Sequence, residues 1–283
     1  MKKQLKKLAP TWLLNRWVIF TEQGRLNRLD QLNCDPTPLA DINQINLAEL
    51  FYACSYEVEW RQIQEHMRRV APSHSGGANT GSYKALYCLI RYLAPTSILE
   101  IGTRLGVSAA YMALGLKSAG NSALAQDLRL TTVDIEDVND PQARPWARYG
   151  SKYSPSEMMT ELGCAHLVTF TTANSLDFMA NAELGYDLIF LDGDHSAPVV
   201  YREIAAALNI LNSGGWILLH DYFPGLKPLW PDQPPISGPY LATRRFQKEG
   251  ANINICPLNK LPWFTRSNST ATSLALMGSS PTF

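Results

Sequence analysis

The chain has 283 residues, of which 46% are hydrophobic, enough for one large domain or for one domain with a helical appendage. Its 25 lysines and arginines balance 25 acidic residues, and this zero net charge excludes a general binder of nucleic acid or acidic polymers. The five cysteines are scattered without a C-x-x-C pair, which favours a reduced, cytoplasmic protein with neither a disulfide framework nor a zinc site. No apolar run approaches the roughly 18 residues that a membrane-spanning helix needs.

Residues 1–79 are expected to form a helical extension that ends in a loop. Residues 1–20 combine lysines with aromatic and aliphatic side chains, but polar residues and a proline interrupt the apolar run, so a signal peptide is not indicated. Two interpretations stay open for this segment. It lies on an anionic membrane surface, or it packs on the body of the protein or on a second copy of the chain, which is the interpretation we favour. Helical periodicity from Asp41 to Val70 precedes a Gly- and Ser-rich loop at 71–81.

A strand, a glycine turn and a helix follow one another in the middle of the chain. Ser97–Ile101 has the composition of a short buried strand, Gly102 ends it, and Gly106 precedes a helix expected from Val107 to Lys117. The spacing differs from the G-x-G-x-x-G of pyrophosphate-binding folds. Glu100 stands just before the first glycine, where a carboxylate would repel phosphate and attract a cation. The turn therefore predicts a nucleoside-like, positively charged ligand and disfavours a NAD-dependent oxidoreductase.

Polar residues follow the later strands as well. The strand expected at Leu130–Asp134 ends in an acid, which could accept hydrogen bonds from a ribose diol or simply cap a turn. Apolar strands at Leu188–Leu191 and Trp216–Asp221 also end in charged residues. The recurring strand–helix–strand order predicts an α/β fold with a doubly wound, mostly parallel sheet, whose carboxyl edge binds the ligand. The residues at such strand ends are Glu100, Asp134, Asn174, Asp192, His195, His220 and Asp221.

These motifs resemble the class I S-adenosylmethionine-dependent methyltransferases, in particular the small-molecule O-methyltransferase branch and its methyltransferase family 24. The matching segments are Leu99–Ser108, Asp134, Phe190–His195 and Gly214–Asp221. The resemblance implies a Rossmann-like, seven-stranded sheet whose last strand runs antiparallel, in a cofactor-binding domain that spans residues 80–283. It also implies transfer of a methyl group from S-adenosylmethionine to a hydroxyl of a small molecule, such as a sugar or a natural product.

The resemblance further implies roles for individual residues. The cofactor would be held by Glu100, Gly102, Thr103, Gly106, Ser108, Asp134, Asn174, Ser175 and Asp192. Within this set, residues 102–108 would hold the methionine part, Asp134 the ribose, and Asn174 with Ser175 the adenine. A divalent metal ion would be bound by Asp192, His220 and Asp221, and His195 would be the general base.

One residue departs from the family's pattern. His220 stands where relatives usually carry an acid or an amide, and neighbouring strand residues point to opposite faces, so His220 could face away and leave Asp221 alone in the site. Two carboxylates would suit Mg²⁺, whereas ligation by His220 would favour Mn²⁺ or Fe²⁺. A third interpretation is that no metal binds and Asp221 caps a turn. An accessory protein that binds the cofactor without turnover also stays open.

Overall fold

The structure is a computed structural model, and it describes residues 11–53, 57–72, 77–119, 129–230 and 233–279. The lysines of the N-terminal segment and residues 73–76 of the expected Gly- and Ser-rich loop lie outside these ranges. Within them, no helix combines the length and the hydropathy needed to cross a bilayer.

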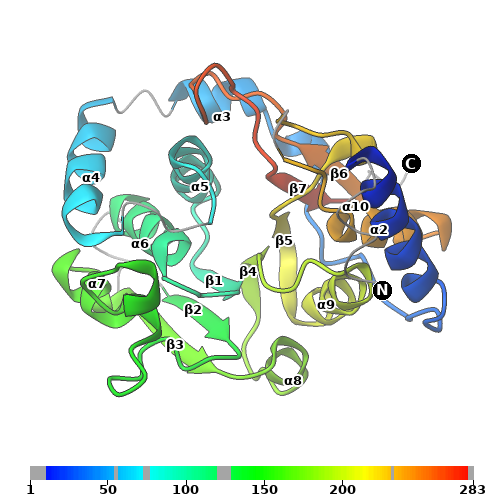
Figure 1. The fold of residues 1–283 in the computed structure, drawn as a ribbon, viewed down its shortest axis with the longest axis horizontal. Helices are drawn as coiled ribbons and strands as arrows, with labels where there is room; N and C mark the ends of the chain where they lie inside the picture. Colours follow the sequence, from blue (N-terminus) through cyan, green and yellow to red (C-terminus); the bar gives the residue numbers. More distant parts are fainter. Residues whose placement is uncertain (1–10, 54–56, 73–76, 120–128, 231–232, 280–283) are drawn as a thin grey trace.

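A seven-stranded sheet forms the centre of the molecule, with the strand order β3-β2-β1-β4-β5-β7-β6 (Figure 1). Neighbours among β1 to β5 pair in parallel, and β7 runs antiparallel to both β5 and β6. This topology confirms the predicted doubly wound sheet with an antiparallel last strand. The strands are β1 Ser97–Ile101, β2 Arg129–Asp134, β3 Val168–Thr172, β4 Tyr186–Leu191, β5 Leu211–Leu219, β6 Asn254–Pro257 and β7 Ala275–Gly278.

Helices cover both faces of the sheet, because the strands alternate apolar side chains between two cores. Ile98 and Phe190 belong to the core beneath α5 and α6, whereas Leu99 and Ile189 belong to the core beneath α9 and α10. All five residues of β1 are buried, as expected for a central strand covered on both sides. The helices of this part are α5 Thr80–Leu93, α6 Val107–Ala119, α7 Pro155–Glu161, α8 Ser175–Ala180, α9 Ala197–Ile210 and α10 Gly238–Lys248. Short 3₁₀ turns are η2 Pro145–Tyr149, η3 Ala165–Leu167 and η4 Pro224–Leu226.

The N-terminal part is helical and is joined closely to the rest. It contains α2 Thr11–Leu26, η1 Ile42–Gln44, α3 Leu47–Ala53 and α4 Glu57–Val70, so the periodicity expected from residue 41 to 70 forms three separate elements. Between α2 and η1 the backbone meets the sheet, since Ala40 N donates to Gly215 O at 2.9 Å and Ser279 N donates to Ala40 O at 2.8 Å.

Helix α2 lies beside α9 and α10 (Figure 1). Leu26, at its end, is fully buried, but Trp17 and Phe20 are 55% and 77% exposed. The body of the protein thus leaves much of these two side chains exposed, and packing on a second copy of the chain, the other form of the favoured interpretation, stays a prediction.

Candidate active site

A cavity of about 770 Å³ opens at the carboxyl ends of β1, β2, β4 and β5. Its size falls within the ~300–1,000 Å³ typical of pockets for small ligands. Most of the residues that the sequence placed at strand ends or in the glycine turn meet here. Those that line the cavity are Gly102, Thr103, Ser108, Asp134, Asn174, Ser175, Asp192, His195, His220 and Asp221.

The glycine turn after β1 forms one wall of the cavity. Gly102 has φ 99°, and a Cβ there would lie 2.4 Å from the Asp192 carbonyl oxygen, so only glycine allows β1 and β4 to end this close together. Gly106 has φ 68° and its backbone lies against Pro155, where a Cβ would come within 2.9 Å of the proline Cβ. It stands behind the turn and is not among the residues that line the cavity. The Thr103 and Thr132 hydroxyls share a hydrogen bond of 2.6 Å beneath the wall.

The carboxylate of Asp134 is oriented by the backbone around it. Its two oxygens accept hydrogen bonds from Arg104 N at 2.8 Å and from Glu136 N at 3.0 Å. Each carboxylate oxygen has a further lone pair, so the group can still accept hydrogen bonds from a ligand in the cavity. Asn174 also has a structural role, because its Oδ1 accepts from Leu176 N at 3.0 Å and caps α8.

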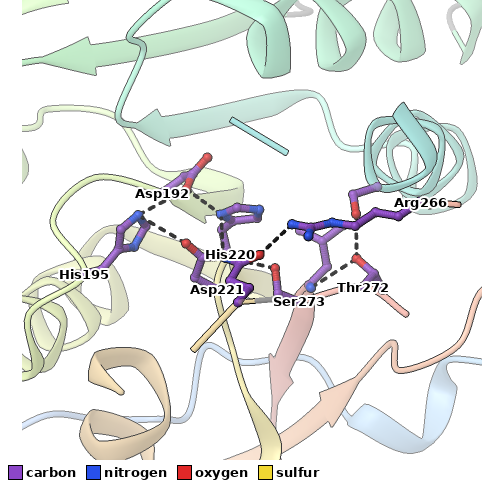
Figure 2. Close-up of polar contacts among 10 residues, drawn as sticks. Asp192, His195, His220, Asp221, Arg266, Thr272 and Ser273 are labelled. Carbon is purple, nitrogen blue, oxygen red and sulfur yellow. Dashed lines mark hydrogen bonds and ion pairs between the residues drawn. The ribbon is translucent and has the colours of Figure 1, made fainter. Parts of the chain in front are cut away.

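Two histidines and two aspartates meet where β4 and β5 end (Figure 2). The shortest contact joins His220 Nδ1 to Asp192 Oδ1 at 2.8 Å, and His220 Nδ1 lies 3.5 Å from Asp221 Oδ1. His195 Nε2 is 3.5 Å from Asp221 Oδ2 and 3.9 Å from Asp192 Oδ1. One nitrogen or oxygen atom from each of Asp192, His195 and His220 lies within 4.8 Å of the others, so these three could hold a metal ion together.

His220 and Asp221 both turn into the site, which corrects the expectation that His220 could face away. Strand alternation does not apply to the pair because β5 ends at Leu219, and Asp221 adopts the left-handed region with φ 50°. Ser273 Oγ donates to Asp221 Oδ1 at 3.2 Å and fixes that carboxylate. Burial lowers the pKa of His220, but the negative charges of Asp192 and Asp221 outweigh it and raise the pKa to about 9.

His220 Nδ1 provides a test of whether a cation would fit this cluster. The atom is buried and makes no hydrogen bond, even though Asp192 Oδ1 is only 2.8 Å away. A cation bound by both atoms would satisfy them and would offset the clustered negative charge. The donor set therefore fits a metal ion.

Residues 99–222 match the family model described as a methyltransferase domain. This stretch, 124 of the 283 residues, is thus similar to the methyltransferase domains of that family. The chain is also similar to the rhamnosyl O-methyltransferase of Mycobacterium tuberculosis (strain ATCC 25618 / H37Rv), with 27% identity over 165 residues that cover 58% of this chain and 60% of that protein. It thus spans about 60% of the length of the mycobacterial relatives that it matches.

Solved structures share the fold of this chain. The O-methyltransferase TomG from Streptomyces achromogenes, in complex with SAM, has a TM-score of 0.51 at 19% identity, over 84% of this chain and 98% of that chain. The O-methyltransferase from Bacillus cereus, in complex with SAH, has a TM-score of 0.50 at 17% identity, over 94% of this chain and 100% of that chain. The sheet thus has the Rossmann-like fold of class I methyltransferases.

Glu100 departs from its expected place at the ligand. It is completely buried, accepts a hydrogen bond from Thr132 Oγ1 at 2.6 Å and does not line the cavity. Alternation along β1 directs it with Ile98 towards the α6 side of the sheet. Burial raises the pKa of Glu100 to about 8, although the Ser108 and Thr132 hydroxyls lower it. The carboxyl group therefore stays mostly protonated at neutral pH and presents no negative charge to a ligand.

Glu203 also lines the cavity, and its sequence context did not mark it as a site residue. It lies on α9, is 2% exposed and accepts a hydrogen bond from Ser175 Oγ at 2.6 Å. Burial raises its pKa to about 7, Ser175 lowers it and Asp194 raises it further. The available signal was helical spacing, which puts this acid on the buried face of α9 with Val200 and Ala207.

Proposed function

We propose that this protein transfers a methyl group from S-adenosylmethionine to a hydroxyl of a small molecule, with help from a divalent cation. The observation that carries the proposal is a single cavity that joins the glycine turn and Asp134 at one end to the Asp192, His195, His220 and Asp221 cluster at the other. This arrangement suits a reaction in which a nucleoside-linked methyl donor must meet a metal-bound acceptor.

The cofactor end of the cavity supports a nucleoside ligand. We propose that Gly102, Thr103, Gly106 and Ser108 shape the binding site for the methionine part, with the backbone of the turn in close contact. Asp134 would accept hydrogen bonds from the ribose diol, since both of its oxygens are already oriented. Asn174 and Ser175 would lie beside the adenine, and the carbonyl of Asp192 would close the turn from the other side.

At the other end, we propose that Asp192 and His220 hold the cation, together with Asp221. Two aspartates with an imidazole favour Mn²⁺ or Fe²⁺ over Mg²⁺, because imidazole suits softer ions. Such an ion would lower the pKa of an acceptor hydroxyl and fix its orientation. Catalysis by the chain itself would then consist mainly of holding the acceptor oxygen and the sulfonium in line.

His195 is proposed as the general base. Its side chain is 33% exposed, whereas that of His220 is 9% exposed, so His195 is the histidine that an acceptor can reach. Its Nε2 lies 3.5 Å from Asp221 and can take the hydroxyl proton. The competing role is that of a third metal ligand, which the close approach of Asp192, His195 and His220 favours. The metal affinity of a His195 variant separates the two roles, because loss of a ligand would weaken metal binding and loss of a general base would not.

We propose a sugar hydroxyl as the acceptor. The relative from M. tuberculosis is named a rhamnosyl O-methyltransferase, and the cavity wall beyond the cluster combines an aromatic ring with polar groups. In this wall Arg266 lies over the Trp230 ring at 4.1 Å and donates to Gln233 Oε1 at 2.5 Å. The guanidinium and the amide are polar groups that suit the hydroxyls of a sugar.

Two further proposals concern the surroundings of the protein. Free cysteines, including two partly exposed ones at Cys34 and Cys256, suit a reducing compartment such as the cytoplasm. The exposed Trp17 and Phe20 on α2 favour self-association through this helix.

Calorimetry with two adenosine-containing ligands tests the proposal. S-adenosylhomocysteine should bind to the purified protein with micromolar affinity, and NAD should not bind. Binding of NAD alone would favour the oxidoreductase alternative and overturn the proposal. Binding of S-adenosylhomocysteine without any methyl transfer to a panel of sugars, phenols and other small hydroxyl compounds would favour a non-catalytic accessory protein.

A further inference from the structure

The helix that follows His195 begins with an unusual cap. The first N–H groups of a helix have no partner within the helix, and the N-cap side chain commonly accepts from them. The N-cap residue of α9 is Ser196, whose side chain makes no such hydrogen bond. The first N–H of the helix, that of Ala197, donates to Glu22 Oε2 at 2.8 Å, across 175 positions of sequence. Ala197 is fully buried, so Glu22 satisfies an N–H that water cannot reach.

Glu22 is itself held in place from two directions. Its side chain is 14% exposed and pairs with Arg25 at 3.0 Å on the same helix. The end of α2 is attached to α10, because Arg245 donates to the Leu26 carbonyl and to the Leu29 carbonyl, the latter at 2.9 Å. The carboxylate is thus presented to α9 from a firmly docked helix.

The backbone of His195 lies between this cap and two other contacts. Asp194 Oδ1 accepts from Ser196 N at 2.6 Å, which fixes the turn just after the histidine. On the far side, the start of α10 packs against the His195 carbonyl so closely that a Cβ on Gly238 would lie 1.9 Å from it. A shift in the first turn of α9 would therefore move His195 relative to Asp221, whose carboxylate is 3.5 Å from Nε2.

We propose that Glu22 is a positioning residue for His195: by capping α9 from the N-terminal helix it holds the imidazole in the orientation that the reaction needs. The proposal rests on the methyl-transfer function above and extends it to a residue outside the matched methyltransferase domain of residues 99–222. It makes the docking of α2 a condition for full activity, because the cap is lost if α2 leaves α9.

Three variants test the proposal. In Glu22→Ala the cap is lost, and turnover should fall about tenfold or more, since small misplacements of a reacting group can cost up to ~10²-fold. KM for the acceptor and affinity for S-adenosylhomocysteine should stay within about twofold. Glu22→Gln keeps an oxygen that can accept from Ala197 N and should restore most of the turnover. Arg25→Ala removes the ion pair but leaves the cap and should behave as wild type.

A measurement that needs no acceptor accompanies the kinetics. With ¹³Cε1-labelled histidine, the His195 resonance, assigned by its loss in His195→Gln, should shift or broaden in Glu22→Ala and return in Glu22→Gln. The resonances of His66 and His166, which lie on other elements, should stay unchanged. An unchanged His195 resonance with wild-type turnover in Glu22→Ala would overturn the proposal. Equal impairment of Glu22→Gln, or of Arg25→Ala, would also overturn it. If the wild type transfers no methyl group, the proposed function fails, and the resonance alone still decides whether Glu22 positions His195.

Discussion

Replacing Glu203 by glutamine should change how the stability of the protein depends on pH. Glu203 is 2% exposed, and burial raises the pKa of its carboxyl group from the ordinary 4.5 to about 7. The folded protein therefore binds this proton more tightly than the unfolded chain does. The stability that this bound proton contributes is fully present below pH 4.5 and is lost as the pH rises through about 7. A glutamine cannot ionise, and its amide oxygen can still accept the hydrogen bond from Ser175.

The size of the effect follows from the two pKa values. A tenfold change in proton affinity corresponds to about 1.4 kcal/mol. The rise in the pKa of Glu203 from 4.5 to about 7 therefore lowers the free energy of unfolding of the wild type by about 3 kcal/mol at pH 8. At pH 5 the carboxyl group is still protonated in the folded state, whereas most of it is ionised in the unfolded chain. The free energy of unfolding is then lowered by only about 1 kcal/mol. The advantage of Glu203→Gln over the wild type should therefore grow by about 2 kcal/mol between the two pH values.

Urea unfolding followed by circular dichroism at pH 5 and pH 8 measures this difference. Glu161→Gln, an exposed acid on α7, serves as the control and should show no comparable change with pH. If the free energies of unfolding of Glu203→Gln and the wild type differ by the same amount at both pH values, Glu203 is not buried as a carboxylic acid.

Three further predictions concern the cavity. Asp134→Ala should weaken binding of S-adenosylhomocysteine by about 10- to 100-fold in calorimetry, because charge-assisted hydrogen bonds are worth about 1.5–3 kcal/mol; unchanged affinity would remove Asp134 from the site. Methyl transfer should stop in EDTA and return with Mn²⁺, and Asp192→Asn should abolish the return; full activity in EDTA would exclude the metal. His195→Gln should lower turnover by about 10²–10⁴-fold and leave Mn²⁺ affinity nearly intact, whereas a large loss of Mn²⁺ affinity would make His195 a ligand.

The sheet could be predicted from the sequence because its signals are local. Strand β1 is a short apolar run followed by Gly102, and the close approach of Asp192 O to that glycine shows why a side chain is excluded there. Strand β4 is apolar up to its last residue, and the polar residues begin immediately after it. Such patterns mark the carboxyl edge of a parallel sheet before any long-range contact is known.

The orientation of side chains within the site could not be predicted in the same way. The sequence does not show that β5 ends at Leu219 or that Asp221 takes a left-handed backbone, and these two features turn His220 inward. Glu100 lies on the face of β1 that is turned away from the cavity, so its position two residues before Gly102 was a misleading signal. Glu203 and Glu22 act through contacts between distant elements, with Ser175 and Ala197 respectively, and sequence spacing carries no information about such contacts.

The most direct test of the account is transfer of a labelled methyl group. The purified protein is incubated with S-[methyl-¹³C]adenosylmethionine, Mn²⁺ and methyl α-L-rhamnoside or another sugar from the acceptor panel, and the products are followed by NMR. The account predicts a new ¹³C-labelled methyl ether on one sugar hydroxyl, together with S-adenosylhomocysteine in equal amount, and loss of both in His195→Gln. Absence of any labelled ether across the panel, in a protein that also fails to bind S-adenosylhomocysteine, would contradict it.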